Sequence, residues 1–203
     1  MRLVTLLRAV GSVVTLLAAV AVWPPATLEA EAADLVGQGR QALDADRVDD
    51  AIALFEKAVS AEPRNPAALA WLGSAQVRKA GKVGGMEAAG WVKRGFDALD
   101  EAVERFPAAF VVYMVRGSTA GRVPPMFNKT ELAVKDLSTV VAMKNRRPDA
   151  VPDGMMPLVY LNLGLAQKKA GRPADARAAW EKGRTLYPAA PEAAAIDKEL
   201  KGL

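Results

Sequence analysis

Two stretches of the chain, residues 35–63 and 160–188, match each other at a constant offset of 125 residues. Each begins with a large residue, followed by a Gly after four residues, an Ala after twelve more, an aromatic residue after four and a Pro after eight. Helix-turn-helix repeats with a period of about 34 residues carry this pattern, so the repetition predicts stacked helical hairpins. The matched pairs are Leu35 and Tyr160, Gly39 and Gly164, Ala51 and Ala176, Phe55 and Trp180, Ala58 and Gly183, and Pro63 and Pro188.

Each of these positions has a physical role in a helical hairpin. A Gly inside a helix costs about 1 kcal/mol relative to Ala, so Gly39 and Gly164 are expected where tight helix packing offsets that cost. Phe55 and Trp180 are expected to be buried, because they supply large aromatic area. Pro63 lacks the backbone donor that a continuing helix needs, and we expect the second helix to end there.

Two further hairpins lie between the outer copies, and insertions lengthen both. Gly73 follows Gly39 by 34 residues, whereas Gly117 follows Gly73 by 44. Gly-rich and Pro-rich sequence predicts lengthened turns over residues 81–85 and 121–127, and apolar residues at helical spacing predict a long helix over 86–106.

These positions resemble those of the tetratricopeptide repeat (TPR) family from residue 33 to about residue 188. The resemblance implies an all-α fold: a right-handed TPR solenoid of about four helical hairpins plus a C-terminal capping helix. The first helix of each pair would line a concave face that receives a peptide or a partner's helix. The expected organisation is a signal peptide at 1–32, a TPR domain at 33–188 with repeats at about 33–65, 66–109, 110–156 and 157–188, and a capping helix at 189–203.

The first 32 residues read as a secretory signal peptide. Arg2 and Arg8 accompany an uncharged run of 14 residues at 9–22, and Ala30, Glu31 and Ala32 place small residues at the spacing a signal peptidase requires. We therefore expect a periplasmic or otherwise exported protein, with retention as an uncleaved anchor as the alternative. The chain has no Cys, which excludes lipoprotein attachment.

The composition argues against catalysis. The chain has no His and no Cys, which removes the Ser-His and Cys-His nucleophile systems and the commonest zinc ligands. The carboxylates at residues 97–104 are expected on a solvated helix face. We therefore expect no enzyme activity, no cofactor and no metal site. The formal net charge is +4, but no nucleic-acid motif accompanies it, so we expect no nucleic-acid partner.

The resemblance to the TPR family also indicates which side chains face the concave groove. When the groove-facing positions of the family are carried over to each repeat of this chain, the resemblance implies an apolar groove with a basic rim. Such a groove suits an acidic or amphipathic protein or peptide. The predicted partner-binding residues are Arg40, Leu43, Ser74, Val77, Arg78, Met114, Ser118, Arg122, Leu161, Leu165, Lys168 and Lys169.

The expected function is that of an exported scaffold or adaptor that binds a protein or peptide partner, with a role in cell-envelope assembly. The alternative is a small-ligand-binding TPR protein associated with a solute transporter, in which the two lengthened turns cover a pocket. A deep enclosed pocket would favour the second function and an open groove the first. The sequence leaves the partner's identity and the oligomeric state open.

Processing of the N-terminus gives a direct test of export. The mature chain should begin at about Ala33, because the apolar run is short and a peptidase site follows it. N-terminal sequencing of protein from an envelope fraction checks this, and an intact Met1 in membranes would favour the anchored form.

Overall fold

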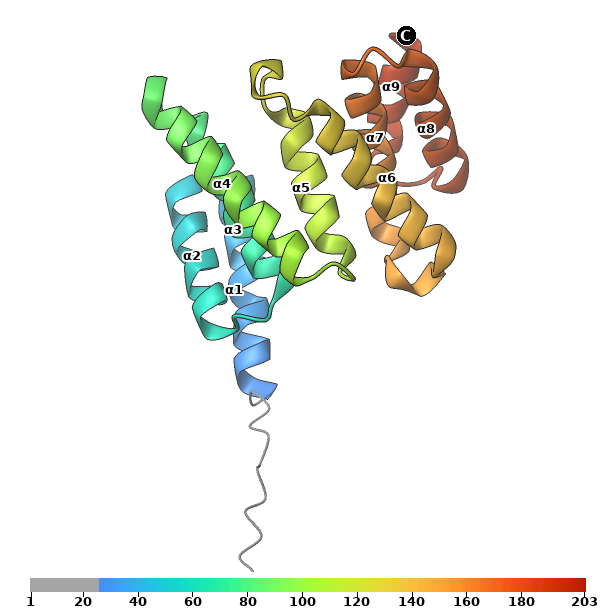
Figure 1. Cartoon of the computed structure of the whole chain (residues 1–203). Coiled ribbons are helices and arrows are strands. Elements are labelled where there is room, and N and C mark those ends of the chain that lie inside the picture. Colours follow the sequence, from blue (N-terminus) through green and yellow to red (C-terminus); the bar gives the residue numbers. More distant parts are fainter. Residues whose placement is uncertain (1–25) are drawn as a thin grey trace, which may run out of the picture.

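A computed structural model describes residues 26–203, which form a row of helices (Figure 1). The chain runs through antiparallel helix pairs in sequence order. The helices are α1 (Ala26–Asp44), α2 (Val48–Ala61), α3 (Pro66–Ala80), α4 (Gly85–Arg105), α5 (Phe110–Arg122), α6 (Thr130–Arg146), α7 (Met156–Lys169), α8 (Pro173–Leu186) and α9 (Ala193–Lys201).

Short connections separate these helices, and the longer ones contain single turns of 3-10 helix. Within residues 26–203 there is no strand, and four hairpins followed by a terminal helix make a solenoid. The predicted fold class is therefore confirmed. The 3-10 turns are η1 (Pro125–Phe127), η2 (Pro148–Ala150) and η3 (Asp153–Met155).

Local sequence sets where several helices begin. Asn65 precedes α3, and its side-chain oxygen accepts hydrogen bonds from the backbone N–H groups of Ala67 and Ala68 at 3.0 and 3.2 Å. Pro66 follows in the first helical position, where its missing donor costs nothing. Helix α4 covers the long helix predicted over 86–106 to within one residue at each end.

The two helices of a hairpin approach each other most closely at glycine. A Cβ added to Gly39 would lie 2.5 Å from a ring carbon of Phe55, and one added to Gly164 would overlap the indole of Trp180. Phe55 and Trp180 are both fully buried, as predicted. The aromatic rings thus occupy the space that the glycines leave open.

The second hairpin has a close contact of another kind, made by two glycines. A Cβ on Gly95 of α4 would lie 2.6 Å from the backbone oxygen of Gly73 in α3, and 2.5 Å from a methyl carbon of Val77. Backbone therefore meets backbone at this crossing. Helix α4 lies tightly along α3 for this reason.

The junction between the second and third hairpins differs from the other junctions. Here the second helix of one hairpin, α4, has little contact with α5; the equivalent contacts of α2 with α3 and of α6 with α7 are more extensive. The first helices α3 and α5 instead contact each other more extensively than α1 and α3 do. In Figure 1 α5 stands uncovered between α4 and α6. The solenoid is therefore more open on the side of its second helices at this junction.

A buried arginine bridges that junction. Arg116 of α5 donates hydrogen bonds to both carboxylate oxygens of Asp136 in α6, at 2.7 and 2.9 Å, and to Asp100 of α4 at 2.8 Å. Burial, the largest influence, disfavours the Arg116 charge, yet the two carboxylates outweigh it and raise the pKa of Arg116. Burial likewise raises the pKa of Asp136, and Arg116 opposes that shift. Because Asp136 accepts from two donors of one guanidinium, we treat the pair as ionised at neutral pH.

The predicted signal peptide falls largely outside the described residues. Of the expected peptidase site, Ala30, Glu31 and Ala32 lie within α1, and the side chain of Ala32 is buried. Among the described helices none combines the length and the apolar character that crossing a membrane requires.

The glycine contact between α3 and α4 can be tested with a pair of substitutions in one helix. Gly95→Ala should destabilise the fold by about 1 to 3 kcal/mol, because the added methyl group meets backbone atoms that cannot rotate away. Gly90→Ala should instead be neutral or stabilising by up to about 1 kcal/mol, since a Cβ there meets nothing within 4 Å. Urea unfolding of both variants measures the difference, and equal stabilities would refute the contact.

Candidate functional site

The apolar side chains predicted to line the concave groove belong mostly to the core. Leu43, Val77 and Met114 are only 4%, 8% and 7% exposed. Leu161 is half-buried, and Leu165 is 39% exposed. These three side chains pack within the core, Val77 against Gly95 of α4, so they leave little surface for a partner, contrary to the expectation that they cover one.

The two predicted serines take part in hydrogen bonds between first helices. The Ser74 hydroxyl of α3 accepts from Thr119 of α5 at 2.9 Å, and the Ser118 hydroxyl accepts from Asn162 of α7 at 3.0 Å. These bonds join three successive first helices. Both hydroxyl groups are therefore engaged within the solenoid.

Two predicted arginines meet where α3 and α5 end. Arg78 lies near enough for its positive charge to act on Arg122, and both side chains are exposed. Asp46, in the turn after α1, pairs with Arg78 at 3.5 Å and with Lys82 more closely. One carboxylate thus pairs with two cations, and Arg122 itself forms no ion pair with any residue of the described chain.

The surroundings of Arg122 disfavour its charge even though its side chain reaches solvent. Protein atoms packed around the guanidinium lower its pKa, and the charge of Arg78 lowers it further. An anion beside the two guanidinium groups would favour their charged forms and so counteract both effects.

The other predicted basic residues have different surroundings. Arg40 is exposed, and its guanidinium lies 5.2 Å from the ring centre of Trp71. Lys168 pairs with Glu199 of α9 at 3.0 Å. Lys169 donates to the backbone oxygens of Gly121 and Val123 at 3.0 and 2.6 Å, so it caps the end of α5. The two lysines therefore stabilise the solenoid, and the structure does not bring all five basic residues into one site.

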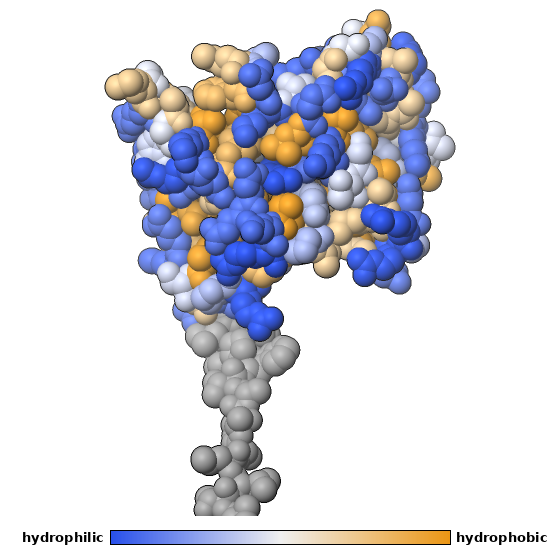
Figure 2. Space-filling view, viewed as in Figure 1, coloured by the Kyte–Doolittle hydropathy of each residue, from blue (hydrophilic) through white to orange (hydrophobic). Residues whose placement is uncertain are grey.

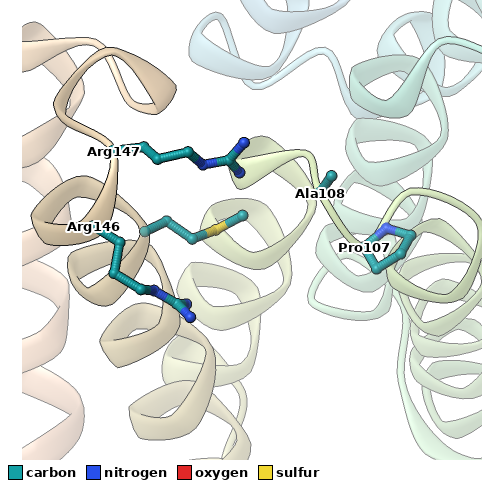
Figure 3. Close-up of a pocket in the computed structure, with 5 residues that line it drawn as sticks. Pro107, Ala108, Arg146 and Arg147 are labelled. Carbon is teal, nitrogen blue, oxygen red and sulfur yellow. The ribbon is translucent and has the colours of Figure 1, made fainter.

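Two surface pockets of about 590 Å³ each lie outside the concave groove. One, on the first hairpin, is lined by residues of α1 and α2 that include Leu35 and Glu56. The other lies between the α4–α5 turn and the end of α6 (Figure 3). Both open to solvent, and the lengthened turns at 81–85 and 121–127 line neither of them.

The visible face carries charged and apolar side chains intermixed. In Figure 2 hydrophilic atoms are spread over all the helices, and the apolar patches among them are separate from one another. Within residues 26–203 no group of three or more acidic, His or Cys side chains is arranged to hold a metal ion.

Comparisons with known proteins agree with this architecture. Residues 36–85 match the family described as tetratricopeptide repeat. A thermophilic TPR protein from Thermus thermophilus has a similar structure, with a TM-score of 0.59 at 21% identity over 83% of this chain and 79% of that chain. No curated protein matches the chain in sequence.

Structures of MamA are also similar to this chain. A MamA variant gives a TM-score of 0.52 at 22% identity, covering 85% of both chains. MamA from MSR-1 gives 0.51 at 21% identity, covering 84% of this chain and 95% of that chain. The repeat pattern, the match over residues 36–85 and the similar structures agree on a fold of the tetratricopeptide repeat type. Such a fold is a scaffold for protein–protein interaction.

Proposed function

We propose that this chain is an exported, non-catalytic scaffold that holds an acidic or amphipathic segment of a protein partner against its concave face. A role in assembling the cell envelope follows from export together with the scaffold fold. The signal-like sequence of residues 1–32 supports the export part of the proposal, and the repeat fold supports the scaffold part.

The arginine pair at the ends of α3 and α5 is the observation from which we infer an acidic partner. Arg78 and Arg122 lie near enough for one charge to lower the pKa of the other, and Arg122 forms no ion pair within the described residues. Two guanidinium groups held together repel each other, and a carboxylate between them satisfies both. This favours an acidic side chain of the partner at that place.

Two further exposed side chains extend the surface from the arginine pair. Arg40 lies toward the N-terminal end over Trp71, and Leu165 offers an exposed apolar group on α7. An amphipathic segment that spans these positions places its acidic side near Arg78 and Arg122 and an apolar residue on Leu165. The two pockets described above are open to solvent, which favours a segment lying along the surface over an enclosed small ligand.

A charge reversal at the arginine pair tests this function. The double variant Arg78→Glu and Arg122→Glu should lower partner capture at least about tenfold, because it replaces attraction by repulsion at the proposed contact. Capture is measured by photo-crosslinking from a benzoylphenylalanine placed at Leu165, with the partner identified by mass spectrometry of envelope extract.

The matched control is Lys93→Glu and Arg177→Glu, which makes the same change of net charge on exposed residues of α4 and α8. Its crosslinking should equal that of the unaltered chain, and circular dichroism should show the same helical content for all three proteins. Undiminished crosslinking to the same partner in the Arg78 and Arg122 variant would exclude the concave face as the site.

A further inference from the structure

The pocket at the end of α6 lies at the open junction between the second and third hairpins. Because α4 is held against α3 at Gly73 and Gly95, it lies away from α5 on the side of the second helices. The turn after α4 and the last turn of α6 form the opposite walls of the pocket. The opening therefore follows from the packing of the neighbouring hairpin.

Two arginines and an apolar surface line this pocket. Arg146 and Arg147 line it from the end of α6, opposite Pro107 and Ala108, and Arg147 points towards Ala108 (Figure 3). Met143, only 7% exposed, completes the lining. The pocket thus combines two cations with a small apolar surface.

The charges of these two arginines are not neutralised within the described chain. Neither forms an ion pair there, and the one side-chain hydrogen bond of Arg146 runs to the backbone oxygen of Ala142, at 3.3 Å. By contrast, Arg105, Arg116, Arg172 and Arg184 all pair with a carboxylate at 2.7 or 2.8 Å.

Nearby residues do not change this balance. Lys144 adds a further cation, but it pairs with Asp153 and donates to two backbone oxygens. Asp149 follows in η2, and it pairs with neither arginine. Cations at the C-terminal end of α6 are favoured by the helix dipole, which accounts for basic residues there. The dipole does not account for two guanidinium groups that face the same apolar wall.

We propose that this pocket binds an acidic side chain of a partner polypeptide, next to an apolar residue of the same segment. Arginine suits a carboxylate because its planar fork of donors matches the two oxygens. The apolar neighbour lies on Met143, Pro107 and Ala108. The site is separate from the concave face, so it gives the scaffold a second contact on the side of its second helices.

Methionine methyl signals of the full chain provide a local test. The chain has seven Met residues, and methyl-¹³C labelling of Met143 reports on the pocket. Met86 and Met126 lie outside the pocket and are 92% and 80% exposed, so their signals serve as controls. The probe is a blocked peptide with a Glu flanked by two Leu, and its control carries Gln in place of Glu. We expect the Glu peptide to shift Met143 and leave Met86 and Met126 unchanged.

Variants assign the effect to the two arginines. Arg146→Gln with Arg147→Gln should weaken the Met143 titration at least about tenfold. Arg177→Gln on α8 should leave it unaltered. The double variant Arg78→Glu and Arg122→Glu should also leave it unaltered, so this test and that of the concave face can fail separately.

Three results would overturn the proposal. The first is a Met143 signal that stays unchanged at millimolar Glu peptide. The second is a Met143 shift, equal to that of the Glu peptide on the unaltered chain, caused by the Gln peptide or seen in the Arg146 and Arg147 variant. The third is an equal Met143 shift caused by the same concentration of inorganic phosphate. The last would identify a general anion site that does not select a polypeptide.

Discussion

The close approach of paired helices at glycine is the constraint on which this structure depends. At Gly39, Gly164 and the crossing of Gly73 with Gly95, even one added carbon would meet a ring or the backbone. Interiors packed to crystal-like density do not absorb such an intrusion without moving whole helices. Phe55 and Trp180 lie on the second helices of the first and last hairpins, where each ring fills the space that the facing glycine leaves.

This constraint also shapes the surfaces available to a partner. Helix α4 packs tightly on α3, and α3 contacts α5 closely, so the first helices are joined at this junction while α4 and α5 have little contact. Arg116 bridges the open side through Asp100 and Asp136. Removing one member of this bridge would be costly, because it would leave the other charge buried and unpaired. The exposed arginines lie at the edges of this junction, where packing does not bury them.

The sequence predicted the repeat fold well, because glycine, aromatic and proline positions encode short-range geometry. It predicted the candidate site less well. The position of a residue in the repeat tells which side of a helix it occupies, but it does not give the distance to the next helix. For this reason Leu43, Val77 and Met114 were expected to be accessible to a partner. The partners of Lys168 and Lys169 belong to α9 and to the end of α5, and these tertiary contacts have no local signal. The pocket beside Arg146 was missed for the same reason, although the basic sequence at the end of α6 was visible.

We conclude that each hairpin closes at its own glycine, against an aromatic ring in the first and last hairpins, and contacts only its neighbours. Hydrogen exchange of Trp180→Ala, read by mass spectrometry peptide by peptide, tests it most directly. Trp180 is fully buried and donates to the backbone oxygen of Leu161 at 3.1 Å, so its loss should cost about 3 to 5 kcal/mol. We expect faster exchange in α7, α8 and α9 and unchanged exchange in α1 to α4. Equal acceleration in all helices would contradict it.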